Sequence, residues 1–121
     1  MANTINVKQC DNELIILAYQ GSASFELCRI LSGNYNSVNV NINIYPGQFQ
    51  GTLLLDGINI GLNGNYNIAL APGIYSLIGL CVDWGGPQAC AFSLNGVGVS
   101  MITTGASIGL FAYTAPVTLT V

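Results

Sequence analysis

Apolar and polar side chains alternate at a period of two in several stretches of the chain. The segment VNVNINI at residues 38–44 alternates with asparagine at every step, and VTLTV at 117–121 alternates with threonine. Successive side chains of an extended strand point to opposite faces, so this pattern gives one buried and one solvated face. No window of a dozen residues carries an apolar stripe at the helical period between helix caps. The sequence therefore predicts an all-β chain.

Turn-forming pairs such as Asp56-Gly57 and Asn95-Gly96 separate the alternating stretches. A spacing of about 8 to 12 residues between turns is typical of a β-sandwich or small barrel. Asn or Asp followed by Gly supplies the positive φ angles of a tight hairpin, so both pairs are predicted to join antiparallel neighbours. Strands are expected at residues 14–20, 23–31, 36–45, 49–55, 65–70, 74–83, 88–94, 97–103, 107–113 and 116–121.

Charged side chains make up only 6% of the 121 residues, whereas about a quarter is usual for soluble domains. Five of the seven lie within the first 29 residues, and only Asp56 and Asp83 follow. The two cations, Lys8 and Arg29, are too few for a nucleic-acid partner, which needs a run of basic residues. A surface this poor in charge would aggregate alone, so we expect other subunits to cover most of it.

The residue types needed for catalysis are also missing. The chain has no histidine, which removes the usual base of serine and cysteine nucleophiles. Asp56 and Asp83 are the only carboxylates after residue 29, and nothing in the pattern brings them together as a glycosidase pair. Four scattered cysteines do not form a zinc motif, and the glycine-rich turns lack the lysine of a phosphate loop. We expect no enzyme activity, no metal and no cofactor.

The length fits a single domain, preceded by a polar segment. We divide the chain into an N-terminal arm or connector, residues 1–13, and a β-sandwich, residues 14–121. The arm lacks the basic and apolar regions of a secretory signal, so either export uses another route or the signal is absent by design. The longest apolar run, residues 14–19, is too short for a membrane-spanning helix. Within the arm, Ile5 and Val7 alternate and either add to a neighbouring subunit's sheet edge or pack against their own body.

The four cysteines divide into two pairs. Cys81 and Cys90 flank the predicted turn VDWGGPQA, which brings them within disulfide reach if their strands pair; two buried free thiols are the alternative. Cys10 lies in the polar arm. With the first pair joined, Cys10 and Cys28 either bridge two copies of the chain or bridge each other within one subunit.

One loop carries a candidate ligand site. Asp83, Trp84 and Gln88 combine an aromatic ring with polar groups, a set that sugar sites use to stack on a pyranose and orient its hydroxyls. The alternative is that Trp84 only covers the end of a sheet. A glycan is therefore a candidate ligand.

Short motifs in the second half resemble known jelly rolls. Gly73-Ile74-Tyr75 and Leu94-Asn95-Gly96-Val97 are similar to the strand start and hairpin of tumour-necrosis-factor/C1q-type jelly rolls on bacterial spore surfaces. A polar arm carrying Cys10 ahead of a Cys-bearing β-domain resembles the endospore-appendage fibre subunits of bacilli. The resemblance implies a jelly-roll-like antiparallel β-sandwich in which Cys10 is the connector thiol.

Together these features favour a structural subunit that self-assembles into an extracellular or spore-surface filament. The expected contacts are sheet edges, the arm and intersubunit disulfides, and the expected partner is the chain itself. The alternatives are an oligomeric lectin-like module that binds through Trp84 and a capsid or decoration subunit of a virus.

Overall fold

The computed structural model describes residues 3–33 and 37–121 of the chain. That part contains eleven strands and no helix, so the all-β prediction is confirmed. It likewise holds no helix long and apolar enough to cross a membrane. The strands are β1 (Asn3–Gln20), β2 (Ala23–Ser32), β3 (Val38–Pro46), β4 (Leu53–Gly57), β5 (Leu62–Leu70), β6 (Ile74–Asp83), β7 (Ala89–Leu94), β8 (Val97–Gly98), β9 (Ile102–Thr103), β10 (Gly109–Tyr113) and β11 (Val117–Thr120).

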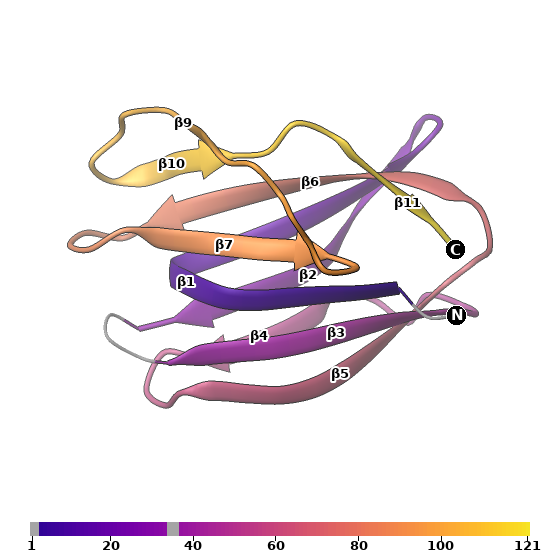
Figure 1. Cartoon of the computed structure of the whole chain (residues 1–121), viewed down its shortest axis with the longest axis horizontal. Coiled ribbons are helices and arrows are strands. Elements are labelled where there is room, and N and C mark those ends of the chain that lie inside the picture. The colour runs from indigo at the N-terminus through magenta and orange to yellow at the C-terminus, as the bar shows by residue number, and fades with distance from the viewer. Residues whose placement is uncertain (1–2, 34–36) are drawn as a thin grey trace.

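Strand β1 passes through both layers of a two-layer sandwich (Figure 1). Residues 3–11 pair with β3 and β7 in the first sheet. Residues 12–20 pair with β2 and β6 in the second sheet. One continuous backbone therefore holds the two layers together.

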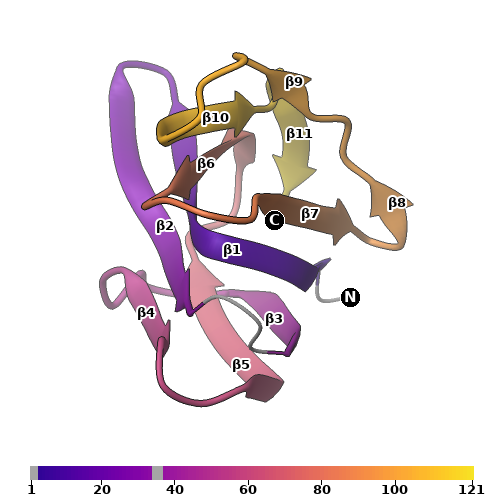
Figure 2. The same cartoon turned by 90° about the vertical axis from the view of Figure 1, so that its left-hand side faces the viewer.

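The first sheet has the order β8-β7-β1-β3-β5. The second has the order β4-β2-β1-β6, with β10 and β11 on the other side of β6 and β9 beside β10. The turned view shows β4 and β5 at one end of the molecule and β9 and β10 at the other (Figure 2). The edge strands are therefore β5 and β4 at one end of the sandwich, and β8 and β9 at the other.

Two pairs of strands are parallel, so the expectation of a wholly antiparallel sandwich is wrong at these places. From β2 to β5 the chain alternates between the two sheets, which makes β4 run parallel to β2 and β5 parallel to β3. Asp56-Gly57 ends β4 and does not form a hairpin, because β4 and β5 lie in different sheets. The Asp56 carboxylate instead accepts the N–H of Ile58 at 3.2 Å. Asn95-Gly96 does form the predicted hairpin, between β7 and β8 with φ angles of 52° and 81°.

The predicted strand boundaries agree best for β2, β6 and β7. The strand expected at 74–83 is β6 with the same ends. The single strand expected at 97–103 is two short strands, β8 and β9, in different sheets. The expected start at position 36 lies outside the described residues. The larger error is β1, which begins at Asn3 and includes the predicted arm.

The core lies between the two sheets and is filled by the inward residues of the alternating strands. β1 contributes apolar residues from both of its halves, so the same core contains side chains from its part in each sheet. The side chains that are fully buried include Ile5, Val7, Leu14, Ile16, Ala18, Leu27, Ile30, Val40, Ile42 and Ile44.

Candidate interaction surface

The predicted N-terminal arm is part of the sandwich. Ile5 and Val7 have no exposed surface and lie between β3 on one side and β7 on the other. A strand paired on both sides has no free backbone groups to add to a neighbour's sheet edge. The arm contact assigned to these two residues is therefore wrong, and its alternative, packing against the chain's own body, is what the structure shows.

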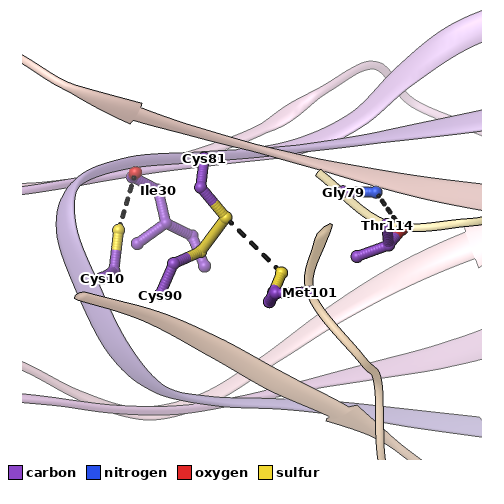
Figure 3. Close-up of a disulfide and its surroundings, with 7 residues drawn as sticks. All are labelled: Cys10, Ile30, Gly79, Cys81, Cys90, Met101 and Thr114. Carbon is purple, nitrogen blue, oxygen red and sulfur yellow. Dashed lines mark hydrogen bonds between the residues drawn. A yellow bond between two sulfur atoms is a disulfide. The ribbon is translucent and has the colours of Figure 1, made fainter. Parts of the chain in front are cut away.

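Cys81 and Cys90 form a disulfide (Figure 3). The bridge was predicted to cross between paired strands, but β6 and β7 belong to different sheets. Cys81 lies opposite Leu14 of β1 and Cys90 lies opposite Cys10. The bridge therefore joins the two sheets beside the point at which β1 passes from one to the other. The sulfur of Met101 lies 3.8 Å from Cys81 Sγ.

The two remaining cysteines are buried free thiols, so the alternative Cys10–Cys28 bridge within one subunit is absent. Cys10 donates a hydrogen bond from its Sγ to the carbonyl of Ile30 at 3.4 Å (Figure 3), and Cys28 has no exposed surface. Burial raises the pKa of each thiol to about 12, with a smaller contribution from nearby carboxylates. Because the thiolate is the reactive form, both the burial and the raised pKa act against a cross-link between copies of the folded chain at either residue.

The predicted ligand loop is built mainly from intramolecular contacts. Asp83 is buried, and its two carboxylate oxygens accept the N–H of Gly85 at 3.0 Å and the amide of Gln88 at 3.2 Å. Gln88 also donates to the carbonyl of Ala106 at 2.9 Å. Trp84 remains 44% exposed, with its indole N–H 3.4 Å from Glu13. The structure brings the three predicted residues together, with the Asp83 carboxylate and the Gln88 amide nitrogen already engaged and the Trp84 ring exposed.

Most of the charge lies on β1 and β2. Arg29 binds Glu13 at 2.8 Å and Glu26 at 2.6 Å. The hydrogen bonds from Arg29 lower the pKa of Glu26, and the same contacts raise the pKa of Arg29. Because five of the seven charged residues lie on these two strands, long stretches of the remaining surface carry no charge.

Asp11 lies beside this region and carries a buried oxygen, Oδ1, that has no hydrogen-bond partner within the described chain. Burial raises the pKa of this carboxyl, and the nearby Asp83 raises it further. A carboxyl whose pKa is higher in the folded than in the unfolded chain stabilises the fold when protonated. That contribution is fully present below the unfolded pKa and is lost as the pH rises through the folded pKa.

We therefore expect Asp11→Asn to stabilise the protein at neutral pH. The gain should be modest, under about 1 kcal/mol, because much of the side chain is solvated, and it should vanish as the pH is lowered towards 4. Chemical denaturation of parent and variant at a series of pH values measures it. Asp56→Asn, which removes the same charge from an exposed turn, is the matched control. A gain for Asp11→Asn that does not change with pH would contradict this assignment.

An ordered array of asparagines covers the outer side of the first sheet. Strands β3 and β5 are parallel and in register, so each asparagine of β3 lies beside one of β5. The array continues into β1, where Asn6 donates to the Asn41 side chain at 2.7 Å and Thr4 donates to that of Asn43 at 3.0 Å. We call the six residues of β3 and β5 the asparagine face: Asn39, Asn41, Asn43, Asn63, Asn65 and Asn67.

The asparagine face reflects an internal repeat that was not recognised from the sequence. The segments VNVNINI at 38–44 and LNGNYNI at 62–68 carry asparagine at the same three positions, 24 residues apart. The β2–β4 pair has a similar offset, with Cys28 beside Leu53. A search for repeats with a period of 20 to 30 residues would have predicted these stacked parallel pairs.

At one end of the molecule, both sheets end in a strand that is paired on one side only. In the described part of the chain, β5 pairs only with β3, and β4 pairs only with β2. We call this end, formed by β4 and β5, the open end. Of the twelve large apolar side chains that the described chain exposes, seven lie beside it or at the opposite end, around β8 to β10. They are Leu54, Ile58 and Ile60 near the open end, and Val97, Ile102, Ile108 and Leu110 at the other.

Comparisons of the chain with models of known protein families, with curated proteins and with solved structures find no match.

Proposed function

We propose that this protein is a structural subunit that self-assembles, through its sheet edges, into a filament or layer. The observation that carries the proposal is the open end, where nine residues of β5 form a sheet edge without any charged side chain. Natural monomers protect such edges with lysine, proline, bulges or a covering segment, because unpaired backbone groups recruit other strands. An edge without these protections is typical of a strand that pairs in an assembly.

The distribution of apolar surface supports the proposal further. A subunit of an extended assembly needs at least two contact regions, and seven of the twelve exposed large apolar side chains lie at two separate ends of the sandwich. The stretch from residue 57 to residue 82 carries no charge at all. Assembly would cover surface that a lone subunit would have to keep in water.

The disulfide supports a location outside the cytosol. Bridges such as Cys81–Cys90 persist mainly in oxidising compartments. Together with the resemblance to spore-surface and appendage proteins, this favours a subunit displayed at a cell or spore surface. The mechanism is narrower than the resemblance implies, since residues 3–11 pair within their own sandwich and the two free thiols are buried.

Negative-stain electron microscopy of the purified protein tests the proposal. We expect filaments or sheets that form without any added template, whereas a viral decoration subunit would need its capsid. A denaturing gel without reductant should show single chains of about 13 kDa, because the contacts are not covalent. Protein that stays monomeric at high concentration would contradict the proposal.

The lectin-like alternative has less support. Asp83 and Gln88 are engaged within the chain, so a sugar would meet Trp84 without the polar partners that give such sites their specificity. We therefore do not propose a glycan as the ligand.

A further inference from the structure

One inference goes beyond self-assembly in general, and it rests on the self-assembly proposed above. We infer that β5 pairs with β5 of a second copy. The two strands run antiparallel, around a two-fold axis that passes between the two Asn65 residues. In this arrangement Asn63 of one copy faces Asn67 of the other, and the first sheets of the two copies join into one. Three observations support this particular partner and register.

The first observation is the direction of the backbone groups of β5. Leu62 donates its N–H to Ser37 at 2.8 Å, and the Leu70 carbonyl accepts from Gly47 at 2.9 Å, so both residues direct these groups towards the β3 side. Backbone groups along a strand alternate in direction with a period of two. Asn63, Asn65 and Asn67 therefore direct their N–H and C=O groups towards the free edge, where the proposed register pairs all of them.

The second observation is that the side chains of β5 are complementary to themselves in this register. On the outer side, the three asparagines are symmetric about Asn65, so every amide faces an amide and the asparagine face continues into the second copy. Ladders of stacked asparagines stabilise paired strands. On the inner side, Gly64 faces Tyr66 of the second copy, and Leu62 faces Ile68. Glycine opposite an aromatic residue leaves room for the ring.

The third observation is the absence of charge. β5 carries no charged side chain, so two copies of it meet without repulsion. A partner protein recognised by charge would find nothing to bind on this strand. A second copy supplies the same edge, the same amides and the same spacing.

Position 65 provides the test, because a two-fold axis places it opposite itself. Asn65→Lys and Asn65→Asp each set like charges face to face, and a mixture of the two sets opposite charges face to face. The control is Asn39→Lys, which adds the same charge to an exposed position of the same face but on β3, one strand inside the edge. Sedimentation velocity on the full chain gives the dissociation constant, and circular dichroism melting confirms that each variant folds.

We expect each single variant to self-associate about tenfold more weakly than the parent, from the like-charge pair and the lost amide contact. The equimolar mixture should return to within about threefold of the parent, and the control should stay there as well. A measurement without any substitution complements these: the amide protons of Asn63, Asn65 and Asn67 should exchange more slowly as the protein concentration rises.

Each other outcome is decisive. Single variants that associate like the parent would overturn the β5 contact and leave self-assembly to other edges. Variants that are weakened but not restored by mixing would show that β5 pairs with a different edge, which overturns the two-fold register. A parent that stops at dimers would support the inference and overturn the filament. A parent that is always monomeric would overturn both.

Discussion

Deletion of residues 1–11 is expected to abolish folding of the chain. The deletion removes the central strand of the first sheet and leaves β3 and β7 without their shared partner. It also removes Ile5 and Val7 from the core and exposes Ile42 and Phe92 beside them. Four side chains of this kind represent roughly 6 to 12 kcal/mol of burial, which is comparable to the whole stability of a small domain.

Far-UV circular dichroism and thermal melting of the deletion variant measure this effect. Within the full chain, Ile5→Ala should cost about 2 to 5 kcal/mol because it leaves a cavity in the core. Lys8→Ala, at an exposed position of the same strand, should change the stability by less than about 0.5 kcal/mol. A deletion variant that still melts cooperatively as a β-protein would show that these residues are a dispensable arm.

Loss of the Cys81–Cys90 bridge should have the second-largest effect. The bridge closes a loop with a sequence separation of 9, and the chain-entropy model gives about 3 kcal/mol for a loop of this size. The double variant Cys81→Ala/Cys90→Ala should therefore unfold at a clearly lower denaturant concentration, with the loss measured by linear extrapolation.

A matched variant separates the bridge from the packing of its atoms. Cys28→Ala removes a buried sulfur that forms no bridge, so it reports the cost of the cavity alone. The double variant should lose more than this control. Equal losses would show that the bridge adds nothing to the stability of the folded chain.

The sequence predicted those elements in which one strand face is simply buried. β6 and β2 alternate over most of their length, and their limits were found to within one residue. The first half of β1 was missed because it is rich in polar residues and because the register shift between Val7 and Gln9 moves the inward positions by one. A polar strand with an interrupted period reads as a loop when only local pattern is considered.

The candidate surface was harder to predict for a different reason. Parallel pairing of β3 with β5 depends on the chain crossing between the sheets, which no single segment encodes. The same holds for the cysteines: the Cys81–Cys90 bridge was predicted from a turn, but the burial of Cys10 follows from the course of β1. The spacing of the two cysteines around the turn allowed this bridge and gave no information on which sheets it would join.

The central place of β1 also determines when this protein can fold during its synthesis. β1 leaves the ribosome before the other ten strands, yet its partners on β6 and β7 lie 57 to 89 residues later, from the pair Tyr19–Ser76 to the pair Ile5–Leu94. Neither sheet can close until almost the whole chain has emerged, and contacts so distant in sequence slow folding. Until then, the unpaired strands of one nascent chain can meet those of a neighbouring nascent chain. In the proposed assembly, each chain must therefore be released and folded before its edge strands can pair with those of another copy. Slow folding would then set the earliest time at which assembly begins.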